Sequence, residues 1–216
     1  GMKKIIQELQ HFIKANTYGT ASDRALLLDY QATLEPKTEK AIKLEKEALA
    51  QIKETTKKNA HLVSNLHSNL GGLYRINGQL NLAKKHMEMG ISLLEQYQLL
   101  YTNDSIPQIN NYAVLLIEIQ EPDLALSALQ KLAQIIKEYN SNHCLDYAQV
   151  QESLGSICLI TANISQAKTH FKKALKIYED IWADEPELIE EKYKKIQELY
   201  PQAGIALAKS ILPTKH

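Results

Sequence analysis

The chain has 216 residues, with 25 lysines and arginines against 25 aspartates and glutamates, and only 8 glycines and 6 prolines. A formal net charge of zero provides no overall attraction to nucleic acid or to an anionic membrane, so neither is expected as a partner. The most abundant residue types, such as Ala, Leu, Ile, Lys, Glu and Gln, lose little side-chain freedom in a helix, which predicts an all-α fold.

Residues 2–15 are expected to form an N-terminal capping helix. Ile5, Leu9 and Phe12 belong to an apolar stripe at helical spacing, and packing of this stripe on the next helices is favoured over a membrane-surface role. Polar residues such as Glu8 interrupt the apolar run, which argues against a secretion signal, and no run reaches the length of a membrane span. A cytoplasmic location is therefore expected.

An alanine recurs every 42 residues through the middle of the chain, and neighbouring small and large residues follow the same period. Residues 22–181 are thus predicted to form four repeats, each a pair of antiparallel helices that buries its apolar face only by stacking on its neighbours. The recurring alanines are Ala41, Ala83, Ala125 and Ala167. Twelve residues before them lie Asp29, Gly71, Ala113 and Gly155, and four residues after them lie Glu45, Met87, Leu129 and Phe171.

Each repeat contains a turn signal between its two helices. These signals are Glu35-Pro36, Asn77-Gly78, Glu121-Pro122-Asp123 and Ala162-Asn163. Asp123 and Asn163 are expected to cap the helices that follow them.

Residues 184–212 are expected to form C-terminal capping helices, so that residues 2–212 make one domain. The front of this segment carries Asp184, Glu185 and Glu187, which are expected to suit the dipole of a helix N-terminus rather than to bind a basic partner.

The best-formed repeat, with Leu70-Gly71, Tyr74, Ala83 and Met87, resembles the tetratricopeptide repeat, whose signature places L-G-x₂-Y before A-x₃-F. Two positions of that signature depart from the pattern. The tryptophan position holds Ala25, His67, Ile109 and Gln151, and the final proline position holds Lys53, Glu95, Lys137 and Glu179. A second helix that continues past this position fits the long 42-residue period, which is similar to that of kinesin light chains and of bacterial peptide-sensing regulators.

This resemblance implies a right-handed α-α superhelix, a solenoid of antiparallel helix pairs whose first helices form a concave wall. In tetratricopeptide-repeat proteins that wall usually binds an extended peptide. Asn69 and Asn111 occupy the place where long-repeat relatives present an asparagine to the peptide backbone, and an amide both donates and accepts hydrogen bonds. The alternative is an amide that contacts only solvent or a neighbouring helix. The predicted peptide- or protein-binding residues are Asn65, Ser68, Asn69, Gly72, Arg75, Asn110, Asn111, Val114, Gln149, Glu152, Ser153 and Ser156.

The corresponding wall residues of the first repeat are largely apolar, and they include Leu26, Leu27 and Tyr30. Either the helix at 2–15 covers them, as we expect, or they form an apolar end of the groove.

No catalytic motif is present in the sequence, so no enzyme activity, metal or cofactor is expected. His86 and His170 share one repeat position, which predicts equivalent helix faces and a structural role. His143 and Cys144 are adjacent, a spacing that rarely lets a nucleophile face its base. Cys158 is expected in the core, and both cysteines are expected to be reduced thiols.

The sequence therefore predicts a non-enzymatic adaptor or scaffold that binds another protein or an extended peptide. One alternative is a small-peptide-sensing regulator that acts through a separate effector. Another is a self-associating module, a weak homo-oligomer, since residues 1–96 are slightly basic and the remainder slightly acidic.

Overall fold

The computed structural model describes residues 4, 8, 19–100, 105–139 and 142–202, and within them helices are the only regular secondary structure. Most of the capping helix expected at 2–15, and residues 203–212 of the C-terminal cap, lie outside this part. None of the described helices is both long and apolar enough to cross a membrane. The helices are α2 (Ala21–Leu34), α3 (Thr38–Gln51), α4 (Ala60–Ile76), α5 (Leu80–Gln96), α6 (Ser105–Glu118), α7 (Pro122–Tyr139), α8 (Leu145–Ile160), α9 (Ile164–Ile181) and α10 (Pro186–Gln202).

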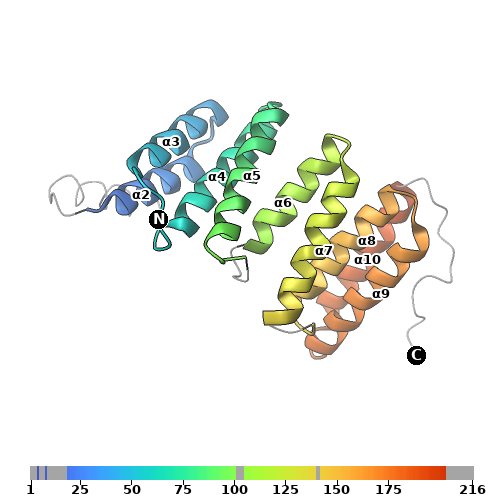
Figure 1. Ribbon diagram of the computed structural model, residues 1–216. Coiled ribbons are helices and arrows are strands. Elements are labelled where there is room, and N and C mark those ends of the chain that lie inside the picture. Colours follow the sequence, from blue (N-terminus) through green and yellow to red (C-terminus); the bar gives the residue numbers. More distant parts are fainter. Residues whose placement is uncertain (1–3, 5–7, 9–18, 101–104, 140–141, 203–216) are drawn as a thin grey trace. The chain divides into compact units, whose positions relative to one another are not determined.

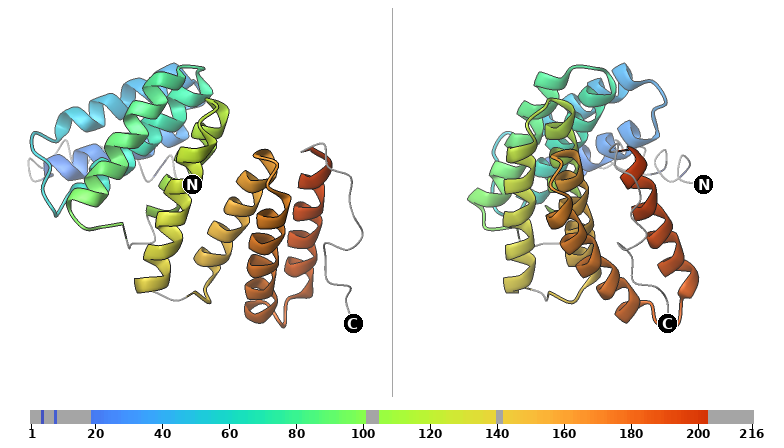
Figure 2. Two further views of the ribbon diagram at one scale, coloured as in Figure 1. Left: turned by 45° about the vertical axis from the view of Figure 1, so that its right-hand side comes forward. Right: turned by 90° about the vertical axis from the view of Figure 1, so that its right-hand side faces the viewer.

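The chain divides into two compact units, residues 1–115 and 116–216. In the first unit α2 pairs with α3 and α4 with α5, and α3 packs on α4 (Figure 1). In the second unit α8 pairs with α9, α7 packs on α8, and α10 contacts both α8 and α9 (Figure 2). The helix bounds follow the four predicted repeats, and the predicted all-α fold is confirmed.

The first helices of the second, third and fourth repeats, α4, α6 and α8, end in the same way at points 42 residues apart. Gly78, Gln120 and Ala162 all adopt left-handed backbone conformations, with φ of 74°, 62° and 59°. After α4, the Gly78 N–H donates to the Arg75 carbonyl and the Gln79 N–H to the Tyr74 carbonyl, which is a Schellman motif. The same pair of bonds closes α6 and α8, so the turn is retained even where the left-handed residue is not glycine.

All four recurring alanines are at most 1% exposed. Ala83 lies beside Gly71 of α4, and Ala167 packs with Cys158 of α8. A Cβ atom added to Gly71 would lie 2.5 Å from Cγ of Met87 and 3.2 Å from the Ala83 carbonyl oxygen. A Cβ atom added to Gly155 would lie 2.6 Å from the Phe171 ring. The predicted pairing of a small residue with a large one is thus observed for α4 with α5 in the first unit and for α8 with α9 in the second.

The two expected N-caps have different outcomes. The Asn163 side chain accepts a hydrogen bond from the Gln166 N–H at 3.5 Å, so the prediction for α9 is confirmed. Asp123 lies inside the first turn of α7, so that prediction is wrong. The reason is that Pro122 begins the helix, where its missing N–H and fixed φ cost nothing.

Two adjacent glycines of α4 provide a direct test of this packing. Gly71→Ala should lower the free energy of unfolding by about 1–2 kcal/mol, because the gain in helix propensity is smaller than the cost of overpacking against Met87. Gly72→Ala should instead raise it, by up to about 1 kcal/mol, since a Cβ added there meets no atom within 4 Å. Chemical denaturation of both variants measures the difference, and equal changes would contradict the proposed close approach.

Candidate functional site

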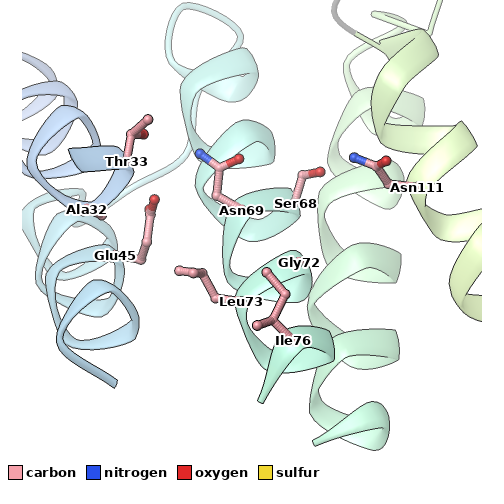
Figure 3. A pocket seen from close by; sticks show the side chains of 9 residues that line it. All are labelled: Ala32, Thr33, Glu45, Ser68, Asn69, Gly72, Leu73, Ile76 and Asn111. Carbon is pink, nitrogen blue, oxygen red and sulfur yellow. The ribbon is translucent and has the colours of Figure 1, made fainter. Parts of the chain in front are cut away.

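A hollow of about 240 Å³ lies within the first unit, on the faces of α2, α3, α4 and α6. Figure 3 shows Thr33 and Glu45 on one side of α4 and Asn111 on the other. Four of the twelve residues predicted to bind a peptide line this hollow, and they are Ser68, Asn69, Gly72 and Asn111. The other lining residues are Ala32, Thr33, Glu45, Leu73 and Ile76.

Asn69 joins α4 to the first helix pair. Its side-chain Nδ2 donates to Oδ1 of Asp29 on α2 at 2.8 Å, although the side chain is itself exposed. Asn111 is also exposed. The two amides occupy equivalent repeat positions and border the same hollow, so they are placed where a ligand in it can reach them.

The remaining predicted residues of the first unit are not among those that line this hollow. Oδ1 of Asn65 accepts a hydrogen bond from Nε2 of Gln108 at 2.6 Å, which commits it to a contact between α4 and α6. Oδ1 of Asn110 is buried and receives no hydrogen bond from the described residues. Arg75 is half-buried, and Val114 is 46% exposed.

In the second unit, Glu152 lies against the C-terminal helix rather than on an open face. It is 7% exposed, and its carboxylate lies 2.9 Å from Nζ of Lys192 and 2.7 Å from Nζ of Lys195, both on α10. The Tyr178 hydroxyl donates to the same carboxylate at 3.0 Å. Burial alone would raise the pKa of Glu152, but the hydrogen bonds and charges of Lys195 and Lys192 outweigh it and lower the pKa. Glu152 therefore holds α10 in place.

The other predicted residues of α8 differ in how accessible they are. Gln149 is exposed, and Ser153 and Ser156 are half-buried. The Ser156 hydroxyl donates to the backbone carbonyl of Glu152 at 3.0 Å, within its own helix.

Sequence reasoning did not select Glu45, which lines the hollow, or Asp29, which interacts with Glu45 and Asn69. Glu45 is 1% exposed, and its Oε2 atom accepts no hydrogen bond from the described residues. Burial, followed by the hydrogen bond and the charge of Asp29, raises the pKa of Glu45 to about 9. The signal in the sequence was that these two acids are exceptions to the small and large columns of the repeat.

His67, at the tryptophan position of the second repeat, is buried and pairs with the half-buried His86 of α5. Their Nδ1 atoms lie 2.9 Å apart, so one ring donates and the other accepts. Burial, with the nearby His86 as a smaller cause, lowers the pKa of His67 to about 4. His170 makes the equivalent contact to Gln151 at 2.8 Å, which supports the predicted structural role of both register-related histidines.

No group of three or more His, Cys, Asp or Glu side chains among the described residues is placed to hold a metal ion. His143 lies 3.8 Å from a carboxylate oxygen of Asp180, and Cys144 occupies the N-cap position of α8. Cys158 is buried, as expected, and neither cysteine forms a disulfide within the part of the chain that the structure describes.

Comparison with known proteins identifies the type of fold. A tetratricopeptide-repeat family model matches residues 105–180, which cover the third and fourth helix pairs. The fold is that of tetratricopeptide-repeat proteins. No curated protein sequence matches the chain.

Solved structures support the same conclusion over most of the chain. BtubC (BKLC) from P. vanneervenii has a TM-score of 0.73 and 16% identity, over 94% of this chain and 82% of that one. A putative kinesin light chain from Podospora anserina with nearly identical TPR-like repeats has a TM-score of 0.68 and 13% identity, over 84% and 89%. YrrB, described as a TPR protein with an unusual peptide-binding site, has a TM-score of 0.52 and 15% identity, over 89% and 92%.

Replacing Glu45 by glutamine should stabilise this tetratricopeptide-type chain at neutral and alkaline pH. The pKa of Glu45 is raised in the folded state, so its contribution to stability is present below about pH 4.5 and is lost as the pH rises towards about 9. Glu45→Gln removes this loss, which amounts to at most about 1.4 kcal/mol per pH unit. Denaturation of both proteins between about pH 5 and pH 8 measures the difference, and parallel pH profiles would show that Glu45 is ionised in the fold.

Replacing Glu152 by glutamine should loosen α10. The variant loses the charge that attracts Lys192 and Lys195, and we expect the free energy of unfolding to fall by about 1–3 kcal/mol. Because the pKa of Glu152 is lowered, its stabilising effect is present above its ordinary value and is lost as the pH falls through the folded-state pKa. Hydrogen exchange of α10 amides measures the effect, with the exposed Glu190→Gln as the control on the same helix. Unchanged exchange in Glu152→Gln would rule out this role.

Proposed function

We propose that this protein is a non-enzymatic adaptor that binds an extended peptide segment of another protein on the faces of α4 and α6. The observation that carries the proposal is the hollow bordered by both Asn69 and Asn111, two amides at the same repeat position. A side-chain amide can donate to and accept from a peptide unit whatever its sequence. Ser68 and Gly72 border the same hollow, so polar groups and open backbone lie together there.

The comparisons add support of a general kind. YrrB, which shares this fold, is described as having a peptide-binding site. Stacked helix pairs provide extended surfaces on which side chains of successive repeats line up, which suits an elongated ligand better than a compact one. Val114 and Ile76 add exposed apolar area on the same helices, at 46% and 73% exposure.

The test is affinity capture from a lysate of the source cell, with bound proteins identified by mass spectrometry. A double variant, Asn69→Ala with Asn111→Ala, should lose a partner that the wild type retains, because both amides border the hollow. The variant is used only if its melting temperature is unchanged. Asn111→Ala alone leaves the Asn69–Asp29 hydrogen bond intact, so it provides a second variant if the double variant is unstable.

A matched control replaces two exposed amides on second helices, Asn81→Ala with Gln130→Ala, and should bind as the wild type does. Synthetic peptides that tile a partner lost by the double variant then identify the bound segment. Partners retained equally by the wild type and the double variant would place the binding surface elsewhere and overturn the proposal.

A further inference from the structure

The first helix pair replaces an apolar contact by two carboxyl groups. At the position where other pairs have Gly71, Ala113 or Gly155, the first pair has Asp29. At the facing position, where others have Met87, Leu129 or Phe171, it has Glu45. Packing of a small residue against a large one is thus exchanged for an acidic pair in the middle of α2 and α3, and stability alone gives no reason for that exchange.

Glu45 has an unsatisfied hydrogen-bonding group at the hollow. The side chain is 1% exposed and lines the hollow, and its Oε2 atom is buried and has no hydrogen-bond partner among the described residues. An unpartnered buried oxygen destabilises the folded state, and each such group in a folded protein calls for an explanation. A ligand that donates to Oε2 would remove that cost.

The rest of the lining favours a cation with an aliphatic stem. The residues that line the hollow include no lysine, arginine or histidine, and Glu45 is the ionisable one among them. Leu73 and Ile76 supply apolar surface beside it, and Ile76 is 73% exposed (Figure 3). At about 240 Å³ the hollow is below the range of roughly 300–1,000 Å³ that is usual for whole small-molecule ligands, which fits a single side chain.

We propose that the hollow binds the cationic end of a lysine or arginine side chain of the bound peptide, with the carboxyl groups of Glu45 and Asp29 as its partners. Leu73 and Ile76 contact the aliphatic stem of that side chain, and Asn69, hydrogen-bonded to Asp29, contacts the peptide beside it. This inference rests on the proposed peptide-binding function and specifies the chemistry of one residue of the ligand.

Proton release accompanies this binding. Two polar groups face Glu45 from neighbouring helices. They are the carboxyl group of Asp29 on α2 and the uncharged amide of Asn69 on α4. In the free protein the carboxyl of Glu45 retains its proton at neutral pH, because burial and Asp29 both raise its pKa. A guanidinium or ammonium group displaces that proton. The affinity for a cationic side chain should therefore increase with pH up to the pH at which Glu45 is already ionised in the free protein.

The test uses four host peptides, acetyl-Gly-Gly-Xaa-Gly-Gly-amide, in which Xaa is arginine, lysine, norleucine or glutamate. Binding is followed by NMR through the methyl signals of Leu73 and Ile76, which line the hollow. Arginine and lysine peptides should shift these signals. The norleucine and glutamate peptides should bind at least about tenfold more weakly, which is the loss expected for one charge-assisted hydrogen bond. The arginine peptide should bind about tenfold more tightly at about pH 8.5 than at about pH 6.

Three variants of the full chain complete the experiment. Glu45→Gln, which should be more stable than the wild type above neutral pH, should weaken arginine-peptide binding about tenfold at about pH 8.5 and abolish its pH dependence. Asp29→Asn should also weaken binding of the arginine peptide. Glu47→Gln, the same substitution at an exposed position of α3, should bind as the wild type does.

Two outcomes would overturn the inference. Equal binding of the norleucine and arginine peptides, with shifts at Leu73 and Ile76, would leave the peptide-binding function standing and show that the hollow does not select a cation. The absence of any methyl shift with the lysine and arginine peptides would exclude the cation site itself. The capture experiment with Asn69 and Asn111 variants separately decides whether the broader function fails.

Discussion

The close contact between the two helices of a pair is the constraint on which the rest of the structure depends. The recurring alanine is buried in all four repeats. Gly71 and Gly155 lie so close to the side chains of Met87 and Phe171 that a Cβ atom at either glycine would clash with them. Bringing the helices this close lets each pair present a continuous apolar face to its neighbour, which is how a repeat without a core of its own becomes stable. The Schellman turns after α4, α6 and α8 return the chain at the same point in each pair.

The first pair departs from this constraint, and its departure creates the most distinctive chemistry of the molecule. With Asp29 and Glu45 at the contact, the space that a methionine or phenylalanine fills elsewhere holds two acids and a hydrogen-bonded asparagine from α4. A carboxyl group kept neutral by burial costs stability as the pH rises. Such a cost is typical of positions that are kept for binding rather than for folding. In the proposed function, the exchange that lowers stability at high pH also supplies the carboxyl groups of the binding site.

Polar contacts also replace the tryptophan expected of the repeat. His67 with His86, and Gln151 with His170, bridge the two helices of their pairs at equivalent positions. Each contact satisfies groups that would otherwise be buried without a partner, and each is geometrically more specific than an apolar contact. Glu152 has a related role one residue further along α8, where its carboxylate joins α8 to α10 through Lys192 and Lys195.

The amino-acid sequence by itself determined the helical class, the 42-residue period, the turns and the residues buried where helices cross. These features follow from local spacing, because a helix places every third or fourth residue on one face whatever surrounds it. Only the tertiary structure decided which polar groups meet. Glu152 was predicted on the binding wall, yet α10, some 40 residues later, supplies its partners. Asp29 and Asn69 are also 40 residues apart, and the hydrogen bond between them forms only when α2 and α4 pack together. The packing of α3 beside them likewise decides that Oε2 of Glu45 is buried without a hydrogen-bond partner among the described residues. A repeat pattern records which positions are small or large, whereas a hydrogen bond requires two particular atoms at one distance, and that distance exists only once the helices have packed.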